Sequence, residues 1–548
     1  MELNVKQISS LCKIRSTDCL ELPQIHSKAC LAGERFSYQI SLQSDMLVYA
    51  DVALESELAE RIRLYRVREA NMDYPMYPNV PEEDYITFVP GPMPDVLVPL
   101  AEENNRIMVR NTPTTVWVKI DVPEDCKPGV YPVTMRFSVR FPGGEIAETI
   151  EKVMTVEVIP VVMPQQELIY TRWFYADCIA QAHQVEIFSE AHWALIEKYI
   201  AAAVDVGVNM ILVPVHTPPL DMEIGTARPC VQLVDIEKKG ESYQFCFEKF
   251  HRFIALCKKC GVRYYEIAHM FSQWGAKSAP NIRVTENGRT DYLFGWHVPA
   301  DSPAYIHFLK QYIGAIAKEL EKEGISENAY FHISDEPLLE QLEAYRRAVS
   351  ILRPLIGNSK TMDAISDYDF YEKGLIECPV TVISKLKKFL EHEIPHQWTY
   401  YFCGQYTQYT NSFLAMPLYR TRILGFLLYK FNIKGFLHWG FNYYNAHCSS
   451  YPLDPFLTTS GDCYYPSGDP FLVYPGPLMS IRAMTFYDAQ QDMRVAQLLE
   501  TMIGRDAVIK LIDDEAGLDL RFTKYPRSAE FLLRVRNKML DLIEECVS

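Results

Sequence analysis

Two adjacent carboxylates, Asp335 and Glu336, follow an apolar, aromatic-rich run in the stretch AYFHISDEPLLEQLEAYRRA. The run before them is typical of a buried strand, and the pattern from Pro337 onward is typical of a helix that starts at this proline. One acid here could cap that helix, because helix N-termini favour carboxylates. Capping needs only one acid, and it does not explain why alternation places His332 and Ser334 on the same face as Glu336. The pattern therefore favours catalysis by both acids.

Two carboxylates at one site indicate glycoside hydrolysis. A conventional retaining enzyme also needs a nucleophile across the site, but the two last strand-like segments, QWTYYFCGQYT and GFLHWGFNYYN, contain no carboxylate. A sugar with a 2-acetamido group can supply its own nucleophile, because its amide oxygen can attack the anomeric carbon and form an oxazolinium ion. One acid would then protonate the leaving oxygen, and its neighbour would hold the amide N–H.

The elements that must position these acids alternate between strands and amphipathic helices over about 300 residues, which predicts a (β/α)₈ barrel. In such a barrel, residues just past the carboxyl ends of the strands form the active site, and the acid pair falls there after the fourth strand. A doubly wound sheet is the alternative, but no glycine-rich phosphate loop follows the first strand. The expected strands lie within residues 167–175, 208–215, 262–268, 329–334, 361–365, 379–384, 397–402 and 435–442.

The chain divides into three predicted parts. Residues 1–163 contain segments such as TTVWVKIDVP and GVYPVTMRFSVRF, whose alternation predicts an N-terminal β-sandwich. Residues 164–490 form the predicted α/β catalytic barrel, and residues 491–548 a helical segment packed on it.

A family resemblance supports this interpretation. The stretches FHISDEP, WTYYFCGQ, MPLYRTRILGFLLYKFNIKGFLHWGFNYYN and YPSGDPFLVYPG resemble those of domain-of-unknown-function family 4091. That family is related to glycoside hydrolase family 123, whose members include β-N-acetylgalactosaminidases, and the likeness covers about residues 165–500. The resemblance implies that Asp335 positions and polarises the acetamido group and that Glu336 is the general acid and base. It also implies a retaining β-N-acetylhexosaminidase with β-linked N-acetylgalactosamine as the expected substrate.

Sugar sites combine aromatic platforms with polar groups that bind hydroxyls. Tyr400 is the predicted donor to the acetamido oxygen, while Trp439 could instead pack behind the site and Asp469 could instead stabilise a turn. The full predicted substrate-binding set is Trp398, Tyr400, His438, Trp439, Asn442, Tyr443, His216, His269 and Asp469.

Composition excludes several other classes of function. The formal charge of −16 opposes binding to nucleic acid or to anionic membranes. The chain has no apolar run long enough to span a bilayer and no signal-peptide pattern, so we expect a cytoplasmic protein. Neither His216 nor His269 forms a metal-binding spacing such as HExxH, and the lone CxxC at Cys257 and Cys260 is weak support for zinc, so we predict no metal and no cofactor. A carbohydrate substrate is the predicted partner, and the sequence leaves open whether the protein forms a homo-oligomer.

Two other functions stay open at this point. A glycosidase acting on a sugar without an acetamido group would need a separate nucleophile, for which Asp363 and Asp177 are candidates. A non-catalytic carbohydrate-binding protein could also keep this scaffold, although binding alone does not require two adjacent acids. The identity of the sugar and the choice between exo and endo action are not fixed by the sequence.

Overall fold

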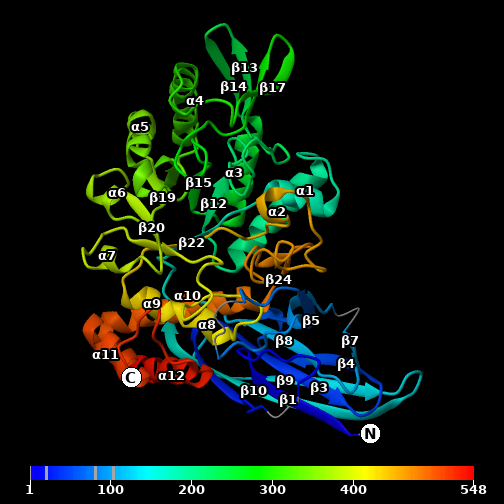
Figure 1. The fold of residues 1–548 in the computed structure, drawn as a ribbon. Coiled ribbons are helices and arrows are strands. Elements are labelled where there is room, and N and C mark those ends of the chain that lie inside the picture. Colours follow the sequence, from blue (N-terminus) through cyan, green and yellow to red (C-terminus); the bar gives the residue numbers. More distant parts are fainter. Residues whose placement is uncertain (1, 19–21, 79–82, 102–104, 548) are drawn as a thin grey trace.

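A closed barrel of eight parallel strands forms the centre of the molecule (Figure 1). The computed structural model describes residues 2–18, 22–78, 83–101 and 105–547. The barrel closes where β22 pairs with β11, in a register that runs from Ile169↔Gly435 to Arg172↔His438. Each strand lies within or within one residue of a predicted segment, so the mixed α/β barrel prediction is confirmed. In order, the strands are β11 (Ile169–Arg172), β12 (Met210–Val213), β15 (Tyr264–Ile267), β18 (Ala329–His332), β19 (Lys360–Ala364), β20 (Cys378–Val382), β21 (Trp398–Tyr400) and β22 (Gly435–His438).

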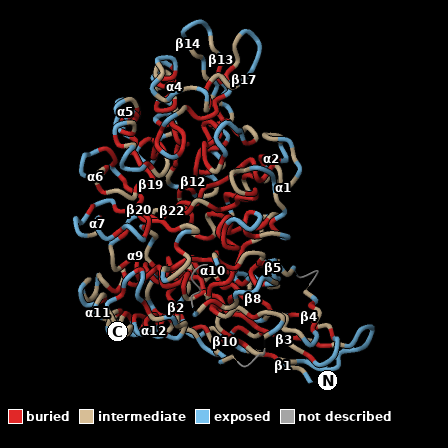
Figure 2. Tube along the Cα trace, in the orientation of Figure 1, coloured by how far each residue is buried: buried red, intermediate tan, exposed pale blue. Residues whose placement is uncertain are grey.

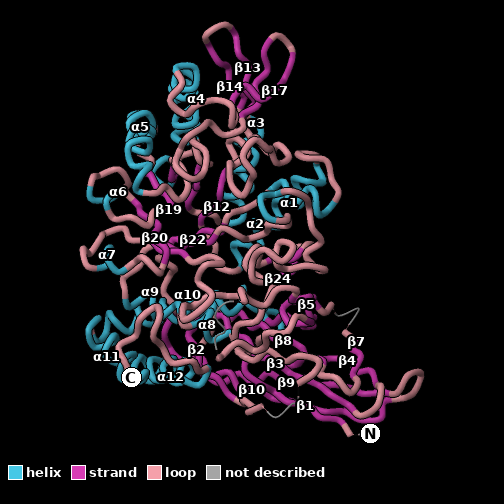
Figure 3. Tube along the Cα trace, viewed as in Figure 1, coloured by secondary structure: helices cyan, strands magenta, loops and turns pink. Residues whose placement is uncertain are grey.

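Helices surround these strands, and three of the long ones carry a standard start or stop signal (Figure 3). The side chains of Ser189 and Ser302 accept N-capping hydrogen bonds at the starts of α2 and α4, and Gly261 caps α3 in a left-handed conformation. Later connections carry much shorter helices. The helices are α1 (Ala176–His183), α2 (Glu190–Asp205), α3 (Glu248–Cys260), α4 (Pro303–Lys322), α5 (Leu342–Leu352), α6 (Asp369–Glu372), α7 (Lys387–Leu390), α8 (Leu418–Arg422) and α9 (Leu424–Lys430).

Two five-stranded sheets precede the barrel and enclose a hydrophobic cluster of their own (Figure 2). Apolar side chains alternate along these strands and meet between the sheets, as expected for a sandwich. One sheet has the order β1 (Leu3–Ser9), β3 (Arg35–Ser44), β8 (Thr114–Asp121), β5 (Ile62–Met72) and β6 (Gly91–Pro99). The other has the order β2 (Ser27–Ala32), β10 (Ile146–Val162), β9 (Gly129–Arg140), β4 (Val48–Glu55) and β7 (Arg106–Val109).

A small four-stranded sheet, which the sequence analysis did not predict, projects from the end of the molecule opposite the sandwich (Figure 1). Its strands come from the long connections after β12 and β15, and Tyr243 packs edge-on against Phe308 of α4 at 4.9 Å. The strands are β14 (Ser242–Cys246), β13 (Asp235–Lys239), β16 (Ile282–Glu286) and β17 (Arg289–Phe294).

The C-terminal part is helical and packs between barrel and sandwich. It comprises α10 (Ile481–Ile503), α11 (Arg505–Ala516) and α12 (Ala529–Val547). The predicted boundary at residue 490 falls inside α10, so this helix belongs to both predicted parts. Within the described ranges, no helix is both long and apolar enough to cross a bilayer.

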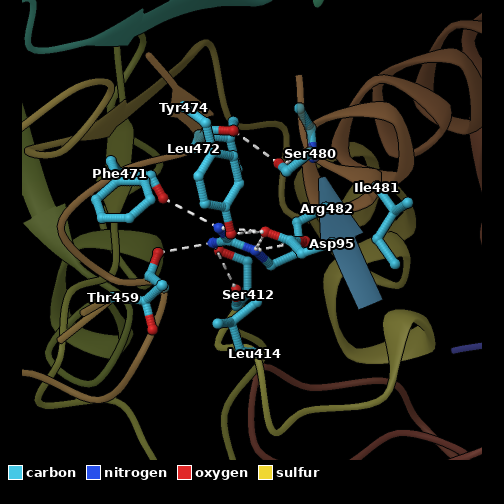
Figure 4. A network of polar contacts seen from close by, with 12 residues as sticks. Asp95, Ser412, Leu414, Thr459, Phe471, Leu472, Tyr474, Ser480, Ile481 and Arg482 are labelled. Carbon is cyan, nitrogen blue, oxygen red and sulfur yellow. Dashed lines mark hydrogen bonds and ion pairs between the residues drawn. The ribbon is translucent and has the colours of Figure 1, made fainter. Parts of the chain in front are cut away.

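A buried ion pair fastens the sandwich to the rest of the chain (Figure 4). Asp95 of β6 lies 2.9 Å from Nη2 of Arg482 on α10, and both side chains are fully buried. The same guanidinium donates to the carbonyls of Ser412, Gly468 and Phe471, which belong to the connections that follow β21 and β22. One arginine therefore joins the sandwich to the loops at the carboxyl end of the barrel.

Candidate active site

Asp335 and Glu336 lie in the turn that begins past the end of β18, at the carboxyl end of the barrel, and both are half-buried. Glu336 has a left-handed backbone with φ of +43°, which is rare outside glycine and interrupts the strand alternation that would turn neighbouring side chains to opposite faces. The Asp335 carbonyl accepts a 2.8 Å hydrogen bond from the Trp274 N–H, which fixes this turn against the chain after β15.

The chain after the acid pair differs from the prediction. Pro337 does not start a helix, because a 3₁₀ turn (Leu339–Gln341) comes first and α5 begins only at Leu342. The N-cap position of the 3₁₀ turn is Leu338, so neither acid caps it. The capping explanation for the pair is therefore wrong.

A buried carboxylate, Asp363 of β19, holds the end of β18 in place. It accepts hydrogen bonds from the N–H groups of Ile333 and Ser334, each at 3.1 Å, and from the Tyr345 hydroxyl at 2.6 Å. Its Oδ1 also lies 2.9 Å from Nδ1 of His332. With four partners and no exposed surface, Asp363 positions the strand end and is unsuited to attack a sugar.

His332 is the centre of a buried charged network below the acids. Its second ring nitrogen donates to Glu266, which also accepts from Thr171 Oγ1 at 2.7 Å and from Trp173 Nε1 at 2.6 Å. Burial alone would lower the pKa of His332, but Glu266 and Asp363 outweigh it and raise that pKa to about 10. The imidazole is therefore a fixed positive charge near the acid pair.

The two acids interact with each other and with common neighbours. Burial raises the pKa of Asp335 well above its ordinary value, and the charges of Glu336 and Asp221 raise it further. Burial also raises the pKa of Glu336, against a hydrogen bond donated by the Tyr400 hydroxyl to Oε1 at 2.5 Å. Because two close, desolvated carboxyls do not both ionise easily, the pair retains a proton that a general acid can donate. Tyr400, predicted to hold the substrate amide, here orients Glu336.

The end of β22 adds an aromatic and polar group of side chains. Trp439 is half-buried, and its Nε1 donates to Asp469 Oδ2 at 2.9 Å. Asp469 Oδ1 lies 3.5 Å from Nε2 of His438, whose Nδ1 accepts from the Gly440 N–H. Burial raises the pKa of Asp469 to about 7 and lowers that of His438 well below its ordinary value. Trp439, His438 and Asp469 thus lie together, although alternation placed His438 and Trp439 on opposite faces, and of the three only Trp439 is partly exposed.

Three predicted substrate ligands have structural roles instead. Asn442 lies beyond the end of β22, and its amide bonds both the N–H and the carbonyl of Tyr175. The buried Tyr443 hydroxyl donates to a backbone carbonyl of its own loop at 2.8 Å. Trp398 begins β21 at the far end of the barrel and fills the space above Gly435, where a Cβ would lie 1.9 Å from the indole. The alternation of side chains placed Trp398 on the same face of β21 as Tyr400, but it did not show how far along the barrel Trp398 lies.

The two predicted histidines are fully buried. His216 Nε2 lies 2.9 Å from the carbonyl of His269, and the His269 ring stacks on His332 at 3.9 Å. Burial lowers the pKa of both, and the charge of His332 lowers that of His269 further. His269, His332 and Asp363 offer ligand atoms within 4.8 Å of one another that could hold a metal ion. To bind there, a metal ion would have to displace the proton that His332 shares with Asp363.

Asp221 is a site residue that the sequence analysis missed. It follows β12 with a left-handed φ of +49°, and its carboxylate accepts from the Tyr175 hydroxyl at 2.8 Å. Burial raises its pKa to about 6, and the charges of Glu336 and Asp469 add to this shift. The signal was available, because Asp221 ends the segment PVHTPPLD in which only His216 was singled out.

Asp177, the other carboxylate considered as a nucleophile, is also held by neighbouring side chains. Asp177 is fully buried and forms a two-pronged ion pair with Arg228 at 2.9 and 2.7 Å. A carboxylate held in this way stabilises the connection after β11 and does not face a substrate.

The fold and the carboxylate pair together define a glycoside hydrolase: an eight-stranded barrel with two acids past the end of a strand. The family model described as "Glycoside hydrolase 123, catalytic domain" matches residues 173–499, more than half of the chain. The protein therefore belongs to glycoside hydrolase family 123, which confirms the predicted relation to that family.

One solved structure agrees with this assignment at the level of the fold. A family 123 glycoside hydrolase from Clostridium perfringens, described in connection with glycolipid glycan hydrolysis, is 17% identical, with 100% of each chain covered and a TM-score of 0.76. A family 5 mannosidase from Rhizomucor miehei is 9% identical, with 63% of this chain and 94% of that chain covered and a TM-score of 0.36. No curated protein sequence matches this chain significantly.

Proposed function

We propose that the protein is a retaining β-N-acetylhexosaminidase that cleaves β-linked N-acetylgalactosamine by substrate-assisted catalysis. The observation that carries this proposal is the left-handed turn at Glu336, which lets two neighbouring acids share one site. The engagement of Asp363 and Asp177 in buried polar networks supports it further, because it removes both expected protein nucleophiles.

The residues divide the chemistry as follows. Glu336, kept protonated by burial and oriented by Tyr400, donates its proton to the leaving glycosidic oxygen. Asp335 accepts the acetamido N–H and balances the positive charge of the oxazolinium ion as it forms. Glu336, now ionised, then removes a proton from the water that opens this ion. Anomeric configuration is retained because the anomeric carbon is attacked twice.

Asp221 favours one alternative. It lies close enough to Glu336 and Asp335 to interact with their charges: the charge of Glu336 raises the pKa of Asp221, and the charge of Asp221 raises that of Asp335. Asp221 could therefore serve as the nucleophile for a sugar without an acetamido group. A 2-fluoro glycoside separates the two mechanisms. It would leave a covalent adduct on Asp221, detectable by mass spectrometry, only if the enzyme used a protein nucleophile.

The direct test compares aryl β-N-acetylgalactosaminides with good and poor leaving groups. Glu336→Gln should lower kcat/KM about 10²- to 10⁴-fold for the poor leaving group and much less for dinitrophenol, which departs without an acid. Asp335→Asn should impair both substrates, and a thiazoline analogue should inhibit the wild type.

The matched control is Glu340→Gln, the same chemical change at an exposed position four residues along the chain. It should behave as the wild type does. Normal cleavage of the same substrates by a double Asp335→Asn, Glu336→Gln variant would overturn the proposed mechanism.

A further inference from the structure

The chain that follows β5 leaves the sandwich and lies against the loops at the carboxyl end of the barrel. We call residues 73–78 and 83–88 the sandwich segment. Asp73 accepts hydrogen bonds from the Thr459 N–H at 2.9 Å and from the Ser460 hydroxyl at 2.5 Å. Tyr74 and Ser467 exchange two hydrogen bonds, at 2.7 and 2.9 Å. These partners belong to the loop that carries Asp469.

The second half of the sandwich segment is fixed to the loop after β21. The Ile86 N–H donates to the carbonyl of Ala415 at 2.8 Å, and the Tyr85 hydroxyl donates to that of Tyr406 at 2.5 Å. Asp84 is paired with Arg420, a fully buried guanidinium. Both halves of the segment are therefore anchored on loops that border the acid pair, on the barrel side of the molecule.

Tyr77 lies between these anchors and is half-buried. Its ring meets that of Tyr406 edge-on at 5.0 Å and that of Tyr74 at 5.8 Å. The Tyr77 hydroxyl interacts with the thiol of Cys403. Burial raises the pKa of this hydroxyl, and the charge of Asp469 raises it further. Cys403 lies three residues after Tyr400, whose hydroxyl bonds Glu336. Burial raises the pKa of the Cys403 thiol, and the charge of Glu336 raises it further. The partly exposed Tyr77 therefore lies on one side of Cys403, and Glu336, the proposed general acid, lies on the other.

We propose that Tyr77, supplied by the sandwich domain, contacts the sugar bound beside Asp335 and Glu336 and is a specificity-determining residue of this site. The role rests on the proposed function, and it extends the site beyond the catalytic-domain match, which begins at residue 173. The tyrosine ring covers an apolar C–H face of the sugar, and its hydroxyl donates a hydrogen bond to a sugar hydroxyl. Because an aromatic ring on a well-anchored segment loses little conformational entropy on binding, it suits this task.

The alternative is that Tyr77 only packs the segment against Tyr406. The variant Tyr77→Phe separates the two, because it keeps the ring and its packing and removes only the hydroxyl. We expect Tyr77→Phe to lower kcat/KM about 10-fold, mainly through KM, with at most a small fall in the unfolding midpoint from the lost contact with Cys403. Tyr77→Ala should lower kcat/KM about 100-fold. The control is Tyr131→Phe, because the exposed Tyr131 hydroxyl bonds the carbonyl of Lys127 within the sandwich.

The measurement uses the full chain and a panel of nitrophenyl glycosides, with calorimetric binding of the thiazoline analogue as a second readout. If the wild type cleaves β-N-acetylgalactosaminide and Tyr77→Phe matches it in kcat/KM and in binding, the inference about Tyr77 is wrong and the proposed function stands. If the wild type cleaves only a different glycoside, the substrate proposal is wrong, and the same Tyr77 comparison on that glycoside still decides the inference. A wild type that neither cleaves nor binds any member of the panel overturns both.

Discussion

The buried carboxyl of Asp469 should make the stability of the protein depend on pH. Its pKa in the folded protein is about 7, against an ordinary value near 3.8, because burial disfavours its charge. The folded state therefore binds this proton more tightly than the unfolded state does. The proton on Asp469 therefore contributes to the free energy of unfolding. This contribution is complete below about pH 4 and is lost as the pH rises through about 7.

The variant Asp469→Asn tests this sign, because an amide stays neutral and can still accept from Trp439. Between pH 5 and pH 8 the variant should gain stability relative to the wild type, by up to about 4 kcal/mol in the free energy of unfolding. Urea unfolding at several pH values measures the difference. Asp454→Asn, at an exposed position, controls for the change of charge. A difference that shrinks as the pH rises would contradict the assignment.

Single residues also show where prediction from the sequence stops. Adjacency made the acid pair recognisable, but the left-handed turn that brings both acids to one site has no signature in SDEP. Trp398 shares a face with Tyr400 but begins β21, because period-two alternation fixes the face of a residue and not its level along the barrel. The position of Asp221 after a strand could be read from the sequence, but its proximity to Glu336 and Asp469 comes only from the fold.

At the scale of elements, the barrel strands were predictable because each is short and buried at all positions or at all but one. β12, β18 and β22 are buried at every position, which is the pattern of a strand covered on both faces. The small sheet was not predictable in this way, because β13 and β14 contain only one buried residue between them and lie inside connections that looked like loops. Insertions of this kind obey no repeat in the chain.

Two helical glycines test how the packing of elements overrides helix propensity. A Cβ on Gly314 of α4 would meet nothing within 4 Å, so Gly314→Ala should stabilise the protein by about 1 kcal/mol. A Cβ on Gly425 of α9 would lie 1.9 Å from the carbonyl oxygen of Ala489 on α10. Gly425→Ala should therefore destabilise the protein by about 1–3 kcal/mol despite the same gain in propensity.

Thermal and urea unfolding of the two alanine variants, each against the wild type, gives both signs in one experiment. The pair is matched in residue type and in helical context, so a difference reports the close approach of α9 to α10. Equal effects of the two substitutions would show that these helices lie further apart than described.

At the scale of the whole molecule, the sandwich and the barrel form one structural unit. The sandwich reaches the active-site loops twice, through the sandwich segment and through the Asp95–Arg482 pair. Gly468, on the loop that precedes Asp469, has a φ of +95°, and a Cβ there would lie 2.9 Å from Arg482 Nη1. The loop therefore fits closely around this arginine, and the arginine is fixed by a strand of the other domain.

Breaking the pair from the sandwich side tests this coupling. Asp95→Asn leaves the buried Arg482 without its counter-charge, which should lower the free energy of unfolding by about 3–5 kcal/mol. It should also reduce glycosidase activity, because the carbonyls of Ser412, Gly468 and Phe471 are held by the same guanidinium. Glu151→Gln, which breaks the exposed pair with Arg136 in the same sandwich, should change stability far less than Asp95→Asn does and leave activity unchanged. If Asp95→Asn lost stability but kept full activity, the pair would hold the domains together without setting the active-site loops. The sandwich would then act on catalysis through the sandwich segment alone.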